Sequence, residues 1–182
     1  MSPFKVVRKL IYLYYVTEFV VVSGEPLFFL IETPQKLAYT YEIRSSDAIG
    51  ARFPSTPFKN IPLRYAEPSH ACSQILPLFQ DAVLIERGSC PFITKALYAS
   101  KAGARVAIIT ESSSESSKWI DMVGDGSDKK SDIPVAFLPG ASGKRIRDYL
   151  MYGGGEVRIT IPLNLSKFDV RTYQAKPPWE LW

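Results

Sequence analysis

The side chains best suited to chemistry in this sequence are two cysteines and one histidine. Cys72 and Cys90 are the only cysteines, and His70 is the only histidine. A cysteine nucleophile needs a reduced thiol and a neighbouring base that takes its proton. An even pair of cysteines in a chain that enters an oxidising compartment is most simply a disulfide, whereas a cytosolic location would favour two free, buried thiols. We therefore expect a disulfide between Cys72 and Cys90, no catalytic residue, and a surface or hydrogen-bonding role for His70.

Neither a metal nor a nucleotide cofactor is expected. Zinc sites are built from several cysteine and histidine ligands, and this chain has one histidine and no third cysteine. Glycine-rich stretches at residues 124–126 and 153–155 lack the strand-to-helix lysine context of a phosphate-binding loop. Four aspartates of the same central region do not match the twelve-residue calcium loop and are expected on a solvated loop: Asp121, Asp125, Asp128 and Asp132.

The first 24 residues have the pattern of a secretory signal peptide. Three basic residues precede an apolar stretch at residues 10–22, and small residues then allow cleavage after Gly24. A transmembrane anchor is the alternative, but these 13 residues are fewer than the roughly 20 that cross a bilayer core, and Glu18 lies among them. A plain buried element is a third possibility. We expect cleavage, secretion and no stable membrane insertion of the mature chain.

The charge of the mature chain argues against some classes of partner. Cleavage would remove three of the 22 basic and one of the 18 acidic residues, leaving a net charge of +2. This charge is too small for a nucleic-acid footprint or a polybasic membrane patch.

One glycosylation site is expected. Asn164-Leu165-Ser166 is an N-x-S sequon without proline in the middle. Such tripeptides also occur by chance, but this one follows a predicted strand at residues 156–161 and should lie where the chain leaves the strand for the surface. We therefore expect a glycan on Asn164.

The centre of the chain has the pattern of a strand–helix–strand crossover. The apolar run 81–86 predicts a buried strand, and residues 92–102 predict a helix that ends at Gly103. Residues 105–110 predict a second buried strand, parallel to the first and joined to it by a right-handed connection.

A similar pattern follows a long connection. Residues 111–132 are rich in serine and acidic residues and predict a surface loop with Trp119 as its large aromatic residue. After this loop, residues 133–138 predict a strand, residues 143–152 a helix, and residues 156–161 a strand with alternating apolar positions.

The N-terminal part predicts two strands, at residues 27–32 and 37–44, and a proline-rich traverse at residues 53–68. The whole pattern favours a compact α/β domain whose mixed sheet has an antiparallel portion contributed by the N-terminal strands. The expected organisation is a signal peptide at 1–24, N-terminal strands and a proline-rich extension packing on the domain at 25–65, a central domain at 66–163 and a C-terminal tail at 164–182.

Several features of the central domain form a recognisable combination. In chain order they are Cys72, the apolar strand 83–85, the sequence ERGSCPF at 86–92, Lys95, the sequence AGA at 102–104, the apolar strand 106–109 and Ile133-Pro134. With this combination, residues 66–150 resemble the protease-associated (PA) domain, a module of secreted peptidases, sorting receptors and membrane ubiquitin ligases. The resemblance implies a mixed β-sheet or sandwich with flanking helices and a βαβ crossover.

The resemblance extends to small secreted proteins in which a PA domain stands almost alone. The ends of the chain support this extension, through Ala66-Glu67-Pro68 before Cys72, the sequon at Asn164 and the closing Pro177-Pro178-Trp179. It implies a non-catalytic module that recognises proteins or controls access to a peptidase active site. We expect a monomer with an unidentified protein or peptide partner.

Four residues are candidates for contact with that partner: Arg87, Trp119, Trp179 and Trp182. Arg87 could instead bind loop carbonyls or an acidic neighbour, and the tryptophans could pack on the domain. Lys95 is expected to be solvated.

Two other functions remain open from the sequence. An uncleaved signal anchor would make the chain a membrane-tethered luminal domain that takes part in cargo transport or trafficking. A hydrolase would have to use His70 and Asp121, the obvious acid–base candidates.

Overall fold

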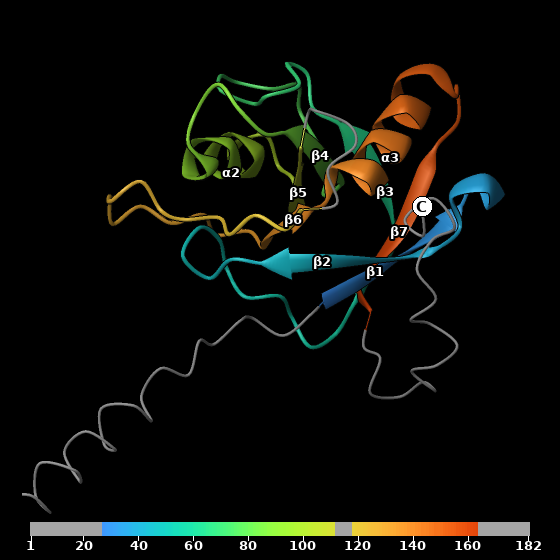
Figure 1. Cartoon of the computed structure of the whole chain (residues 1–182), viewed down its shortest axis with the longest axis horizontal. Coiled ribbons are helices and arrows are strands. Elements are labelled where there is room, and N and C mark those ends of the chain that lie inside the picture. Colours follow the sequence, from blue (N-terminus) through green and yellow to red (C-terminus); the bar gives the residue numbers. More distant parts are fainter. Residues whose placement is uncertain (1–26, 112–117, 164–182) are drawn as a thin grey trace, which may run out of the picture.

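The computed structural model describes residues 27–111 and 118–163, which Figure 1 shows in colour. Several predictions fall outside these residues and remain predictions. They concern the signal peptide at 1–24, part of the central loop at 112–117, the glycan at Asn164, and the contacts of Trp179 and Trp182.

The described chain contains seven strands, two α-helices and one short 3-10 helix. In chain order they are β1 (Leu27–Thr33), η1 (Gln35–Leu37), β2 (Thr40–Ser45), β3 (Phe58–Tyr65), β4 (Ala82–Glu86), α2 (Phe92–Lys101), β5 (Val106–Thr110), β6 (Val135–Leu138), α3 (Gly140–Tyr152) and β7 (Val157–Leu163).

The strands form a closed barrel in the order β1-β2-β6-β5-β4-β3-β7. Strands β3, β4, β5 and β6 are parallel to one another, whereas β1, β2 and β7 pair antiparallel with their neighbours. The predicted mixed α/β fold is therefore confirmed, as are the β4–α2–β5 crossover and the antiparallel portion from the N-terminal strands. Closure of the sheet was not predicted. The expected domain boundary at residue 66 lies between β3 and β4 of this single closed sheet.

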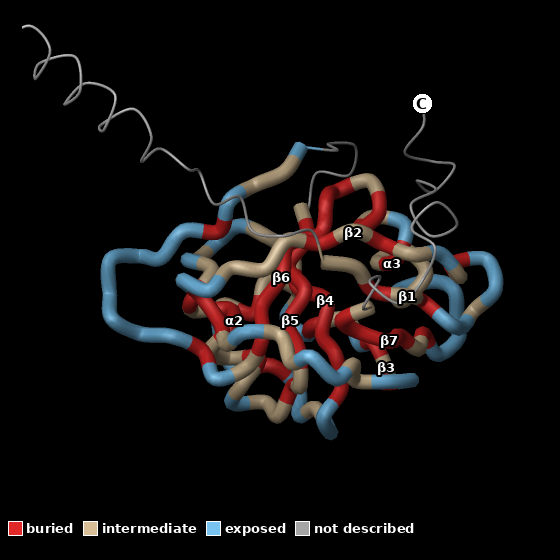
Figure 2. Tube along the Cα trace, turned by 90° about the horizontal axis from the view of Figure 1, so that it is seen from below, coloured by how far each residue is buried: buried red, intermediate tan, exposed pale blue. Residues whose placement is uncertain are grey.

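The parallel strands are buried on both faces, which explains their uninterrupted apolar sequences. In β4, Ala82 and Leu84 belong to the core inside the barrel, whereas Val83 and Ile85 belong to a second core outside it. Strands β5 and β6 alternate in the same way. Figure 2 shows these strands as continuous buried segments.

The two helices contribute side chains to different cores. Ile93, Ala96 and Ala99 of α2 are buried in the outer core. Ile146 of α3 joins the inner core, to which β1, β3 and β7 also contribute. The helices therefore cover different parts of the sheet, as their separation in Figure 1 indicates.

Strand β3 lies inside the stretch predicted as a proline-rich traverse, so that prediction was wrong for these residues. Pro62 lies in this strand opposite Arg158 of β7. Proline lacks the N–H group that a sheet normally uses, so its presence argued against a strand.

Smaller differences occur at element ends. Leu37 belongs to η1 and not to the following strand, and α3 begins at Gly140, three residues before the predicted start. Strand β7 continues through Pro162 to Leu163, so the sequon follows it directly.

None of the helices in the described part of the chain has both the length and the apolar character that a membrane span requires.

Candidate recognition surface at the disulfide corner

Polar side chains gather where the parallel strands end. Tyr65 ends β3, Glu86 ends β4 and Thr110 ends β5, and these strands are neighbours in the sheet. The carboxyl ends of parallel strands meet at one edge of a sheet, which is the usual position of binding sites in α/β proteins. Residues 87–92, which we call the corner, leave the sheet from this edge and lead into α2.

A disulfide joins the corner to the segment that precedes β4. Cys72 and Cys90 are joined by an S–S bond of 2.06 Å with a Cα–Cα distance of 5.8 Å. Gly88 has a φ of +101°, a conformation that favours glycine. Ser89 also has a positive φ, of +66°, which the sequence did not reveal. The disulfide thus holds a turn with two consecutive left-handed residues.

Glu86 is the centre of a hydrogen-bonded network beside the corner. Its carboxylate accepts a hydrogen bond from Arg147 of α3 at 3.1 Å and one from the Ser69 hydroxyl at 3.4 Å. His70 Nε2 lies 3.8 Å from the same carboxylate. Burial, together with a hydrogen bond to Glu86, raises the pKa of Tyr65 to about 12. The network therefore links the ends of β3 and β4 to α3.

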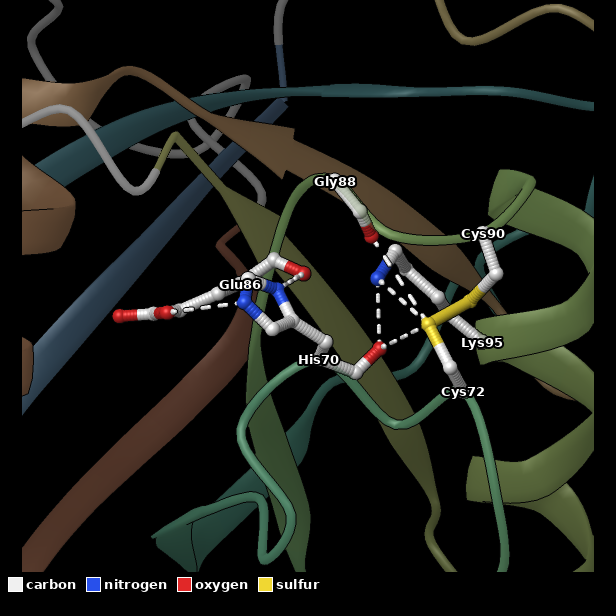
Figure 3. The surroundings of a disulfide bond; sticks show 6 residues. All are labelled: His70, Cys72, Glu86, Gly88, Cys90 and Lys95. Carbon is white, nitrogen blue, oxygen red and sulfur yellow. Dashed lines mark hydrogen bonds and ion pairs between the residues drawn. A yellow bond between two sulfur atoms is a disulfide. The ribbon is translucent and has the colours of Figure 1, made fainter.

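Lys95 is buried, so the prediction of a solvated side chain was wrong. Its exposed fraction is 0%, and its ammonium group donates a hydrogen bond to the carbonyl oxygen of His70 at 2.5 Å. The same nitrogen lies 3.7 Å from Cys72 Sγ (Figure 3). Burial lowers the pKa of Lys95 to about 8, although the charge of Glu86 opposes this shift. The side chain supports the corner from inside.

Arg87 is oriented by an acidic neighbour. One guanidinium nitrogen donates a hydrogen bond to Glu111, which follows β5, and the Arg87 backbone N–H donates to the Thr110 carbonyl oxygen at 2.7 Å. The Arg87 side chain is still 42% exposed, compared with 14% for Glu111. The interaction with an acidic neighbour is thus observed, and the exposed part of the guanidinium remains accessible.

Two comparisons decide the family. A PA domain model matches residues 59–146. A PRADC1-like protein from Drosophila melanogaster is 38% identical over 169 residues, which cover 89% of this chain and 85% of that protein. The chain belongs to the PA domain family.

Other PA domain relatives are longer proteins. The E3 ubiquitin-protein ligase RNF13 from Homo sapiens is 33% identical over 144 residues, but the match spans only 36% of its length. Two solved aminopeptidases share the fold with 18–19% sequence identity: the Aneurinibacillus sp. strain AM-1 enzyme, with a TM-score of 0.54, and a zinc enzyme from Bacillus subtilis, with a TM-score of 0.52. These matches cover 77% and 76% of this chain but only 31% and 30% of the enzymes.

Trp119 of the PA domain is only partly accessible. It packs against the outer core, and the Arg44 guanidinium lies over its ring at 4.3 Å from the ring centre. Contact of Trp119 with a partner therefore remains a prediction.

A pocket of about 490 Å³ lies between the end of β3, the C-terminal part of α3 and the start of β7. Tyr65 and Ser69, which belong to the Glu86 network, line this pocket together with the apolar residues Leu150 and Val157. Met151 lines it and is 47% exposed. The pocket has the mixed lining that suits an apolar side chain flanked by a polar group.

No sequence pattern predicted a single site that combines Tyr65, Glu86, Lys95 and Arg147. The strand pattern could have placed Tyr65 and Glu86, because both end parallel strands, but β3 was not predicted. Arg147 lies in α3 and follows Glu86 by 61 residues in the sequence. Among the described residues, no group of three or more histidine, cysteine or carboxylate side chains is arranged to hold a metal ion.

Proposed function

We propose that this chain is a non-catalytic, secreted glycoprotein whose PA domain recognises a protein or peptide partner through the exposed part of Arg87. The observation that carries the proposal is the orientation of the Arg87 guanidinium by Glu111 on a corner held by a disulfide. Membership of the PA domain family supports a non-catalytic role. Trp119, Trp179 and Trp182 are proposed as further contacts.

The chemistry of Arg87 indicates what the partner presents. A guanidinium has five N–H donors in a planar fork, and Glu111 engages one of its terminal nitrogens. The remaining donors suit a carboxylate or a pair of carbonyl oxygens on an extended peptide. Because the corner is already rigid, binding would order few additional residues, which favours affinity.

Control of access to a peptidase is a second form of the same function. The two aminopeptidases contain this fold as less than a third of their chains. In this form, the partner of the Arg87 surface would be a peptidase.

Selection from a random-peptide library displayed on phage tests recognition. The full chain, with its disulfide formed, is the target, and enriched peptides are then measured against Arg87→Gln. We expect at least tenfold weaker binding by this variant, because a charge-assisted hydrogen bond contributes about 1.5–3 kcal/mol. Arg52→Gln is the matched control, since Arg52 is 87% exposed and pairs with Asp47 away from the corner. Failure to enrich any peptide, or equal binding by Arg87→Gln, would refute recognition through Arg87.

Secretion and glycosylation need a separate experiment. We expect the full chain, expressed in cultured animal cells, to appear in the medium with Glu25 as its first residue. Peptide N-glycosidase should reduce its mass, and Asn164→Gln should abolish that shift. Retention of the uncleaved chain in a membrane fraction would support the tethered luminal alternative instead.

A further inference from the structure

The buried ammonium group of Lys95 lacks a carboxylate partner. In the described part of the chain, no acidic side chain forms an ion pair with Lys95. Its two polar contacts are the His70 carbonyl oxygen and Cys72 Sγ. A buried charge is normally paired, because burial without an opposite charge is costly. The position therefore favours any change that places a negative charge beside Lys95.

Reduction of the disulfide would create such a charge. The Lys95 nitrogen lies 3.7 Å from the sulfur of Cys72, and Figure 3 shows Cys90 on the far side of that sulfur. A neighbouring cation lowers the pKa of a thiol and stabilises its thiolate. The two sulfur atoms are therefore unequal as leaving groups.

We propose that the Cys72–Cys90 disulfide is a polarised exchange site for a dithiol, in which the dithiol attacks Cys90 and Lys95 stabilises the departing Cys72 thiolate. The residues on both sides of Cys90, Ser89 and Pro91, are exposed, which gives a reagent access from the outside. Lys95 approaches Cys72 from the buried side.

The exchange conserves atoms and electrons. A thiolate of the dithiol donates an electron pair to Cys90 Sγ and forms a mixed disulfide. The Cys72–Cys90 bond breaks, and its electron pair stays on Cys72. The second thiolate of the dithiol then attacks the dithiol's first sulfur, which is bonded to Cys90 Sγ in the mixed disulfide. This step releases the Cys90 thiolate. Two electrons thus pass from the dithiol, which becomes a disulfide, to the two cysteines.

The charges around Lys95 define the pH dependence. Glu86, at the end of β4, is the charged group that acts on Lys95, and it is already bound to Arg147. His70 contacts Lys95 through its backbone carbonyl oxygen, and its ring lies beside Glu86. Because Lys95 loses its proton with a pKa of about 8, its effect on exchange should be present at pH 7 and lost at pH 9.5.

Reduction rates of the full oxidised chain test the proposal. With dithiothreitol at pH 7, we expect Lys95→Met to be reduced roughly three- to tenfold more slowly, because a higher leaving-group pKa slows exchange. Lys101→Met is the matched control, since Lys101 is an exposed lysine of the same helix. The ratio of wild-type to Lys95→Met rates should approach one at pH 9.5, and this ratio cancels the ionisation of the reagent. Equal rates at pH 7, or a ratio that does not change with pH, would overturn the proposal.

A measurement on the wild-type chain covers the case in which Lys95→Met does not fold. Brief exposure to glutathione, followed by alkylation with N-ethylmaleimide, labels the two cysteines differently. Peptide mass spectrometry should find glutathione on Cys90 and the maleimide on Cys72. Glutathione mainly on Cys72, or equally on both, would contradict the assigned direction of attack. Neither experiment depends on the proposed partner.

Discussion

At the level of single residues, the position of Lys95 could be predicted from the sequence only in part. Lysine is rarely buried, so a solvated position was the reasonable prediction. The spacing along α2 contained the contrary signal, because Lys95 lies three residues after Phe92 and four before Ala99, on the face that packs against the sheet. What the sequence could not supply is the contact with the His70 carbonyl, which depends on the path of the chain before β4.

The lowered pKa of Lys95 predicts how stability changes with pH. The pKa falls from 10.5 in the unfolded chain to about 8 in the folded one, so between these values the unfolded chain binds more protons. The free energy of unfolding should therefore rise from pH 8 towards pH 10.5, and this rise should be absent in Lys95→Met. Urea unfolding between pH 7.5 and 10 measures it, with Lys101→Met as control. Parallel pH curves for wild type and Lys95→Met would refute it.

The upper limit of that pH range has a physical reason. The pKa of Tyr65 rises from 10 to about 12 on folding, so the folded chain binds more protons in that interval. Its contribution to stability is complete below pH 10 and is lost as the pH rises further. Measurements below pH 10 keep the two residues apart.

At the level of elements, α2 and the buried parallel strands were predictable, whereas β3 and the start of α3 were not. Local apolar patterns identified β4 and β5 because both of their faces are buried. Pro62 concealed β3, since a strand with proline is disfavoured unless its partners accommodate the missing N–H. The position of α3 depends on close contact with β5, which no local pattern reports.

That contact gives a prediction for α3. A Cβ atom on Gly143 would lie 1.6 Å from Thr110 Oγ1 and 2.6 Å from Thr110 Cβ. We expect Gly143→Ala to lower the free energy of unfolding by about 2–4 kcal/mol, because the helix must move away from the sheet. Gly124→Ala is the control, since no atom lies within 4 Å of its Cβ position.

A double variant identifies the cause. Thr110→Ala removes the closest contact, so Gly143→Ala should cost less in that background than in the wild type. Urea unfolding of the four proteins gives the coupling energy. Strict additivity would mean that the clash with Thr110 is not responsible.

At the level of the whole molecule, closure of the barrel could not be predicted from the sequence. The mixed sheet follows from the pattern of strands and helices, but pairing of β1 with β7 joins residues more than 120 positions apart, such as Ile31 and Ile159. Such long-range pairing is selected by the packing of the complete core and leaves no local signal. The candidate site shares this property, because its side chains come from β3, β4 and α3.

Ile159 tests the closure. It is fully buried and pairs with Ile31 of β1 on one side and Ile61 of β3 on the other. Ile159→Ala should lower the free energy of unfolding by about 2–5 kcal/mol, as expected for a large-to-small change in a packed core. Val123→Ala should have almost no effect, because Val123 is 69% exposed. A cost below about 1 kcal/mol for Ile159→Ala would show that the β1–β7 seam adds little to stability.

The same seam has a consequence for how the fold can be connected. Phe28 near the start of β1 pairs with Leu163 at the end of β7, so the polypeptide enters and leaves the barrel at neighbouring points. A domain with this arrangement can be spliced into a surface turn of a host chain without stretching either junction. We expect that inserting residues 27–163 into such a turn of an unrelated carrier protein would preserve both folds.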